Sequence, residues 1–167
     1  MIVAAAVLSG VFLGRFVEKP DPNRKDVRIE AVVMLERMGP RDLACARILE
    51  RTLLQGAGDY SRPELEAMTL EHGMPFRVVL MPDHFRIEMG CRLNSLARGL
   101  SAMQAILSEP RVPDSAFQEA LKGLDRENRD AWSVGLWPDQ PAVKGLTRAE
   151  VLRFFRQAFR SSAMGLV

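Results

Sequence analysis

The feature that most constrains the fold is a pair of apolar, β-branched and aromatic runs joined by a very short connection. Residues 76–81 (FRVVLM) and 85–91 (FRIEMGC) are separated only by Pro82, Asp83 and His84. Two strands with so short a link pair in opposite directions, because a parallel pair needs a crossover of about a dozen residues or more. The sequence therefore predicts an antiparallel hairpin at this place.

Other strands and helices follow from the spacing of apolar residues. Residues 27–35 (VRIEAVVML) alternate, with Val27, Ile29, Ala31 and Val33 on one face, and a last strand begins near Ser161. Apolar residues at steps of three and four predict helices. These helices begin at Arg41–Asp42, Ser61–Glu64, Leu96, Asp114 and Leu146–Glu150, and they end near Gly56–Gly58, His72–Gly73, Leu107, Trp132 and Phe159. Residues 132–144 have the glycine and prolines of a loop.

The order of these elements determines the fold class. Helices grouped between antiparallel strands predict an α+β fold, in which a mostly antiparallel sheet is covered by helices on one face. We expect residues 1–22 to be an apolar N-terminal segment and loop, which includes the first strand or a helix of the fold. Residues 23–167 form a single domain, and 167 residues suffice to bury a core.

The N-terminal segment leaves the compartment open. Residues 2–14 are apolar, but this run is shorter than the roughly 20 residues that span a bilayer, and no basic residue precedes it. We favour a strand or helix of the fold, with a short anchor as the alternative. If the segment is a signal or an anchor, the protein belongs to a bacterial cell envelope; otherwise it is cytoplasmic.

Composition excludes several classes of function. A formal net charge of +2 gives no overall field for nucleic acid, and we expect no nucleic-acid partner. Cys45 and Cys91 are too few for a disulfide framework and fit no metal-ligand spacing, so we interpret them as buried thiols. Trp132 and Trp137 are typical of core packing or an interface anchor. The sequence contains no glycine-rich phosphate loop.

Three stretches resemble a known family. The segment GPRDLACARILERTLLQGAGDYSRPELEAM is similar to the first helices of pitrilysin/insulinase-type metallopeptidases, which have an inverted zinc motif. The mitochondrial processing peptidase and the core proteins of respiratory complex III belong to the same group. The similarity continues through ARGLSAMQAILSEPRVPDSAFQEALKGLDRE and GLTRAEVLRFFRQAFRSSAMGLV, so that it covers about residues 11–167.

The resemblance implies a zinc site that this sequence has lost. Active members carry His-x-x-Glu-His, whose two histidines bind zinc and whose glutamate activates the metal-bound water. Here both histidine positions are arginine, Arg47 and Arg51, while Glu50 stands at the general-base position and Glu127 lies near the position of the third ligand. A guanidinium stays protonated and cannot ligate zinc. We therefore expect no metal, no cofactor and no confident catalytic residue.

Two interpretations of these charges remain open. The spacing of Arg47, Glu50 and Arg51 allows an ion pair on a solvated helix face. In the alternative, Glu127 also meets the arginines and a salt-bridge cluster occupies the former metal site. His72, at a helix end, and His84, in the hairpin turn, belong to no ligand pattern. Arg153, Arg156 and Arg160 share one face of the last helix, as the helix dipole favours.

The family resemblance implies a non-catalytic, peptidase-like domain. Such a domain is the inactive half, or inactive partner subunit, that closes over an active half to form a chamber for extended peptides. We expect a homologous half or a partner subunit, and self-association of the isolated chain, whose C-terminal end stops short of a complete family half. One alternative is a part of an active zinc endopeptidase whose ligands lie in another half. The other is a structural subunit resembling the core proteins of a membrane complex.

Overall fold

In the part of the chain that the structure describes, the protein is an α+β fold built on a four-stranded antiparallel sheet, as the sequence predicts. The computed structural model describes residues 26–35, 38–126, 140–159 and 164–166. The sheet order is β4-β5-β1-β6, and every pair is antiparallel. Its strands are β1 (Asp26–Met34), β4 (Phe76–Leu80), β5 (His84–Arg92) and β6 (Met164–Leu166).

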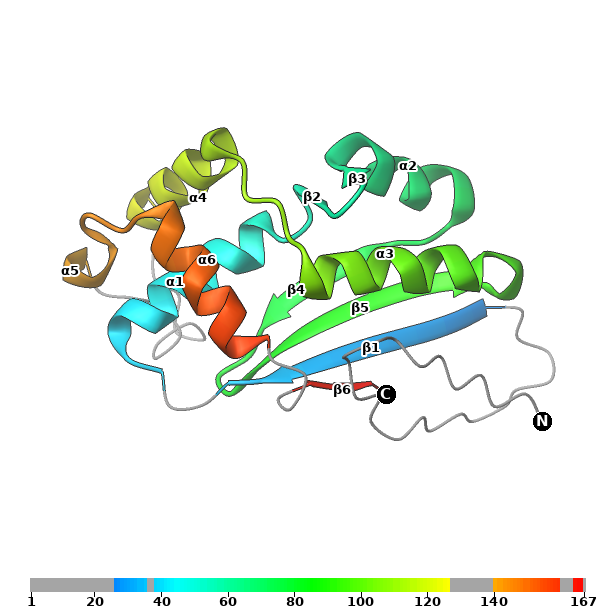
Figure 1. Ribbon diagram of the computed structural model, residues 1–167, viewed down its shortest axis with the longest axis horizontal. Helices are drawn as coiled ribbons and strands as arrows, with labels where there is room; N and C mark the ends of the chain where they lie inside the picture. The colour runs from blue at the N-terminus through cyan, green and yellow to red at the C-terminus, as the bar shows by residue number, and fades with distance from the viewer. Residues whose placement is uncertain (1–25, 36–37, 127–139, 160–163, 167) are drawn as a thin grey trace.

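The helices cover one face of this sheet (Figure 1). One group, which contains α1, α4, α5 and α6, lies over one end of the strands, and α2 and α3 lie toward the other end. Their bounds are α1 (Pro40–Thr52), α2 (Arg62–His72), α3 (Leu96–Ser108), α4 (Asp114–Arg126), α5 (Gln140–Val143) and α6 (Arg148–Ala158). A 3-10 turn (Leu93–Ser95) precedes α3, and two short strands, β2 (Gly56–Ala57) and β3 (Tyr60–Ser61), connect α1 to α2. None of the described helices is both long and apolar enough to cross a membrane.

Alternation along β1 and β5 places the core between the sheet and the helices. Ile29 and Val33 of β1, and Phe85 and Ile87 of β5, are fully buried on the helix side. The opposite face is charged: Glu88 lies 2.8 Å from Arg28 and 3.0 Å from Arg86. The period of two thus separates an apolar face from a face of ion pairs.

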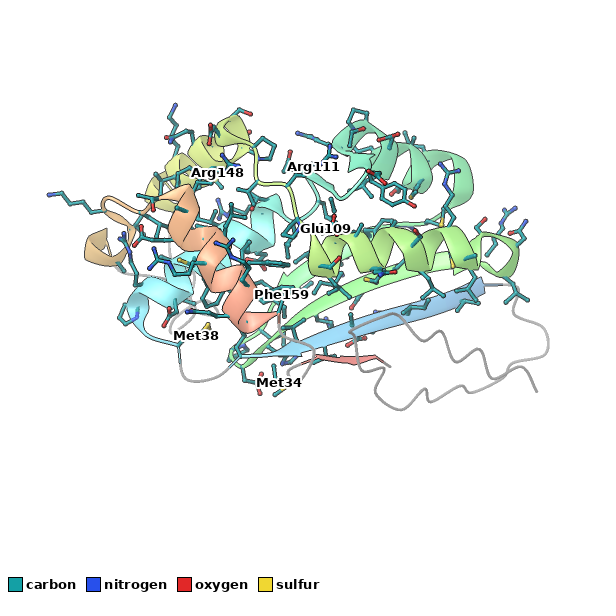
Figure 2. All side chains as sticks on the ribbon, viewed as in Figure 1. Met34, Met38, Glu109, Arg111, Arg148 and Phe159 are labelled. Carbon is teal, nitrogen blue, oxygen red and sulfur yellow. The ribbon has the colours of Figure 1, made fainter. Side chains whose placement is uncertain are left out.

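Helix α6 packs on the sheet through aromatic side chains at its C-terminal end. The Phe159 ring lies 4.3 Å from that of Phe155 and 5.4 Å from that of Phe85 on β5, measured between centroids. Figure 2 shows Phe159 directed from the end of α6 toward the strands. Aromatic rings at such distances contribute packing beyond the area that they bury.

Two local predictions were wrong. The glycines at 56–58 do not end a helix: α1 ends at Thr52, and Gly56–Ala57 is a strand instead. The main-chain N–H groups of Gly58 and Arg111 bond the carbonyls of Glu109 and Gly56, at 2.9 and 2.8 Å. Long-range pairing with the segment between α3 and α4, where Figure 2 labels Glu109 and Arg111, therefore overrides the local glycine signal.

The second error concerns the loop predicted over residues 132–144. Residues 140–143 form the short helix α5, and its Ala142 and Val143 are buried. Proline near the start of a helix is compatible with helical geometry, so Pro141 does not exclude one. Residues 127–139 lie outside the described residues, and with them the end of the fourth predicted helix.

Candidate functional site

The candidate site begins with an ion pair inside helix α1. Arg47 Nη1 lies 2.7 Å from Glu50 Oε2, at the spacing of three residues that the sequence predicts for a pair. The two side chains are only 12% and 21% exposed. The interpretation as a solvated helix face is therefore wrong for Arg47 and Glu50, because α1 is covered by neighbouring elements on this side. A pair shielded from water is screened less than a surface pair.

The other oxygen of Glu50 reaches the sheet. Glu50 Oε1 accepts a 2.8 Å hydrogen bond from the main-chain N–H of Leu80, the last residue of β4. Both carboxylate oxygens are thus bonded, one to a guanidinium and the other to a backbone amide. We call this arrangement of Arg47, Glu50 and Leu80 the Glu50 clamp.

The hydrogen bonds of the hairpin show which amides of β4 point away from β5. At one end, the N–H of Met81 bonds the carbonyl of His84 at 2.8 Å. At the other, the N–H of Gly90 bonds the carbonyl of Pro75 at 3.2 Å. In an antiparallel ladder, bonded and non-bonded pairs alternate along the strand. The odd-numbered residues of β4 therefore bond β5.

The even-numbered residues of β4 consequently direct their main-chain groups outward. They are Phe76, Val78 and Leu80, and Leu80 is the residue whose outward N–H reaches Glu50. β4 is the terminal strand of the sheet in the described part of the chain. Glu50, which the resemblance aligns with the family's general base, is thereby attached to a sheet edge.

Arg51, at the second histidine position, lies against helix α4. A Cβ added to Gly123 would collide with the Arg51 guanidinium, so the close approach depends on the missing side chain. Glu127, expected near this place, lies outside the described residues. Whether it joins the cluster stays a prediction.

This arrangement does not offer the ligands of a zinc ion. Arg47 and Arg51, which the resemblance aligns with two of the family's ligands, carry guanidinium groups that have no lone pair to donate. Across the described residues, no group of three or more histidine, cysteine, aspartate and glutamate side chains could hold a metal. The Nδ1 atom of His84 lies 2.7 Å from the Asp83 carboxylate in the hairpin turn. His72 is the last residue of α2, and its side chain is outside the described part of the chain.

The two cysteines are buried, as the sequence predicts. Burial, together with the smaller effect of the nearby carboxylates of Glu150 and Asp42, raises the pKa of the Cys45 thiol to about 12. The sulfur therefore stays protonated at neutral pH, and a thiol without thiolate character is a poor nucleophile. Arg153 and Arg156 are exposed on α6. Trp132, Trp137 and Arg160 lie outside the described residues.

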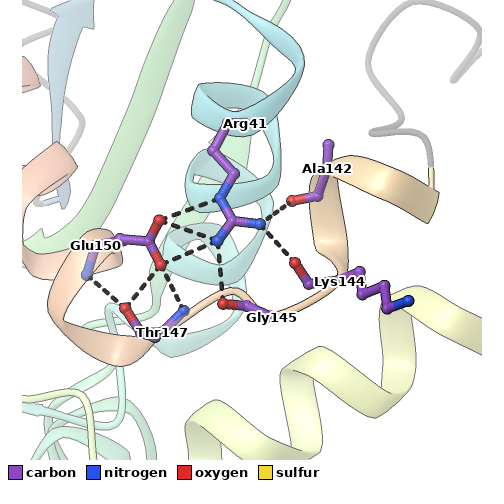
Figure 3. A network of polar contacts seen from close by, with 6 residues as sticks. All are labelled: Arg41, Ala142, Lys144, Gly145, Thr147 and Glu150. Carbon is purple, nitrogen blue, oxygen red and sulfur yellow. Dashed lines mark hydrogen bonds and ion pairs between the residues drawn. The ribbon is translucent and has the colours of Figure 1, made fainter.

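A second charged network fixes the first turn of α1, as Figure 3 shows. The Arg41 guanidinium donates to both oxygens of Glu150, with distances of 2.9 and 3.0 Å from Nη2. It also donates to the carbonyls of Ala142, Lys144 and Gly145, at 2.8, 2.9 and 3.1 Å. These bonds tie α1 to the connection between α5 and α6, and so hold the helix that carries the clamp.

Glu150 is also the acid of a helix cap. Its Oε2 accepts from the hydroxyl and the main-chain N–H of Thr147, at 2.7 and 2.9 Å. These bonds, followed by those from Arg41, lower the pKa of Glu150 to about 2. The sequence predicts a helix start over Leu146–Glu150, which contains this cap. It does not indicate the partner Arg41, because Arg41 lies far away in the chain.

No known family matches the sequence when it is compared with family models, and no curated protein matches it either.

Proposed function

We propose that the chain is a non-catalytic domain of the pitrilysin/insulinase type that binds an extended peptide by strand addition at β4. It acts as an inactive half or partner subunit beside a homologous half. The observation that carries the proposal is the Glu50 clamp. The residue at the general-base position is bonded to a sheet edge, which is where an extended peptide can pair.

The absence of catalysis follows from the same contacts. A general base of this family type needs a metal-bound water to activate. Here Arg47 and Arg51 replace the histidines, and both oxygens of Glu50 already accept hydrogen bonds. A retained glutamate without a metal has no activated water to deprotonate. The expected activity is therefore binding without cleavage.

The binding step relies on the free main-chain groups of β4. An extended peptide that adds to an exposed sheet edge gains affinity from backbone hydrogen bonds, whereas pockets for alternate side chains give specificity. Phe76 and Val78 each direct an N–H and a carbonyl outward from the sheet. Their half-buried side chains also give the edge an apolar border.

Substitution of one outward amide tests the binding step. Val78→Pro removes the outward N–H without breaking a bond to β5, and edge strands tolerate proline in that position. Val78→Ala is the matched control, since it trims the side chain and keeps the amide. We expect Val78→Pro to weaken binding of a blocked, alternating valine–threonine peptide about tenfold or more, and Val78→Ala to weaken it much less. Fluorescence anisotropy with the labelled peptide measures both, and equal affinities would contradict the proposal.

Metal analysis tests the lack of catalysis. The protein should retain no stoichiometric zinc after dialysis and should cleave no peptide. The double substitution Arg47→His with Arg51→His should gain weak zinc affinity, because it restores two nitrogen ligands one helical turn apart. Little turnover should accompany it in an assay of this chain without a homologous half. If the unmodified chain cleaved a peptide and a chelator inhibited that cleavage, the proposal would be overturned.

A further inference from the structure

The Glu50 clamp occupies one end of the edge to which the proposed peptide adds. Glu50 Oε1 takes the outward N–H of Leu80, and Glu50 Oε2 is held by Arg47 at 2.7 Å. Phe76 and Val78 have the same outward geometry, but the clamp does not reach them. The edge is therefore divided into an open part at Phe76 and Val78 and a closed end at Leu80.

All strand pairs of the sheet are antiparallel, so we consider a peptide that pairs antiparallel to β4. The division of the edge limits the hydrogen bonds that such a peptide can form. In such a ladder, a peptide residue opposite an outward residue exchanges two hydrogen bonds with it. A peptide residue opposite Leu80 would need the Leu80 N–H for its own carbonyl. That donor is already bonded to a carboxylate.

We infer that Glu50 sets the register and the length of peptide that β4 accepts. Pairing takes place opposite Phe76 and Val78, and the peptide leaves the edge before Leu80 with its N-terminal side. This inference rests on the proposed function, since it requires peptide addition at β4. It assigns to Glu50 a role in specificity that does not depend on catalysis.

The energetics favour the clamp over a longer ladder. A hydrogen bond to a charged acceptor is roughly twice as strong as a bond between neutral groups. A peptide carbonyl that displaced Glu50 would replace a charged acceptor by a neutral one, and would leave a carboxylate that is only 21% exposed without its amide. Arg47 is the positioning residue, because its ion pair holds the carboxylate in place.

Two blocked peptides test the inference, one long enough to cover Phe76 to Leu80 and one that reaches only Val78. The unmodified protein should bind both with the same affinity. Glu50→Ala frees the Leu80 amide, and it should bind the longer peptide about five- to tenfold more tightly than the shorter one. Glu66→Ala is the matched control: it removes a glutamate from another Arg–Glu pair, whose side chains are 55% and 57% exposed on α2. It should bind as the unmodified protein does.

Amide hydrogen exchange at Leu80 is a second measurement, and it reports directly whether the Leu80 N–H is hydrogen-bonded. Exchange at Leu80 should be slow in the unmodified protein, about tenfold faster or more in Glu50→Ala, and slow again when the longer peptide is added to that variant. If Glu50→Ala folds poorly, Arg47→Met combined with Glu50→Ala removes both charges together and serves the same purpose.

The outcomes separate the inference from the proposed function. If both peptides bind but Glu50→Ala does not distinguish them, the inference fails and peptide addition stands. Unchanged exchange at Leu80 in Glu50→Ala also overturns it. If neither peptide binds any variant, the proposed function fails and the inference fails with it.

Discussion

Two arginines of helix α1 each form an ion pair with a glutamate, but the two pairs connect different parts of the protein. Arg41 crosses to α6, bonding Glu150 and three backbone carbonyls, and it joins parts of the chain about a hundred residues apart. Arg47 pairs within its own helix, and Glu50 carries the contact on to Leu80 of β4. The first pair fastens helices together, whereas the second closes one end of a sheet edge.

The two pairs differ in the hydrogen-bond partners of their glutamates. Both oxygens of Glu150 already accept hydrogen bonds from Arg41, and one of them also accepts from the cap at Thr147. Glu50 instead holds a backbone donor that an incoming strand could also use. Ion pairs with similar distances can therefore serve stability in one place and specificity in another, depending on whether a backbone group at an edge is involved.

The largest expected effect is on stability, from Arg41→Ala. This substitution removes the donors to Glu150 and to three carbonyls, several of them charge-assisted hydrogen bonds. We expect the free energy of unfolding to fall by about 2–3 kcal/mol after allowance for the partial exposure of Arg41. Urea unfolding measures the loss. Arg62→Ala, which breaks the exposed pair with Glu66, is the control and should leave the midpoint unchanged.

Glu50→Ala should destabilise the protein less than Arg41→Ala does. It removes one partly buried ion pair and one backbone hydrogen bond, and it leaves Arg47 without this carboxylate. We expect a loss of about 1–2 kcal/mol in the free energy of unfolding. Should Glu50→Ala prove as damaging as Arg41→Ala in the same urea experiment, the distinction between a fastening pair and an edge pair would be wrong.

The acid dependence of stability should separate the two pairs further. The pKa of Glu150 is lowered in the folded protein from 4.5 to about 2. A depressed carboxyl pKa contributes stability above its unfolded value, and this contribution is lost as the pH falls through the folded value. Glu150→Gln should therefore lose less stability than the unmodified protein between about pH 4.5 and pH 2. Urea midpoints across this range measure the difference, and parallel curves for the two proteins would contradict the assignment.

The local features were predictable from the sequence. The hairpin was evident from its short connection, the faces of β1 from alternation, and the starts of two helices from the segments Ser61–Glu64 and Leu146–Glu150. The Arg47–Glu50 pair follows from helical spacing in the same way. Each of these depends on residues that are close in the chain.

The rest could not be predicted, because it depends on tertiary contacts with the backbone. Leu80 takes part in the clamp through its N–H, which every residue except proline has, so its side chain gives no signal. The main-chain carbonyls that bind Arg41 also give no signal in the sequence, because every residue has one. The strand at Gly56–Ala57 exists because the segment after α3 pairs with it. The approach of Arg51 to Gly123 likewise needs the packing of α4 on α1.

The smallest expected effect concerns the close approach of Arg51 to Gly123. The experiment tests whether Arg51 is fixed in place, as Arg41 is, or can move aside. Gly123 lies inside α4, where alanine is favoured over glycine by about 1 kcal/mol. A Cβ at this position would collide with the Arg51 guanidinium, which is the far end of a flexible side chain. We expect Gly123→Ala to change the free energy of unfolding little in the unmodified protein, because the helix preference and the displacement of Arg51 offset each other.

In an Arg51→Ala background the collision is absent, and Gly123→Ala should stabilise the protein by about 0.5–1 kcal/mol. Urea unfolding of the four proteins measures the coupling between the two positions. Equal effects in the two backgrounds would mean that Arg51 moves aside freely, unlike Arg41.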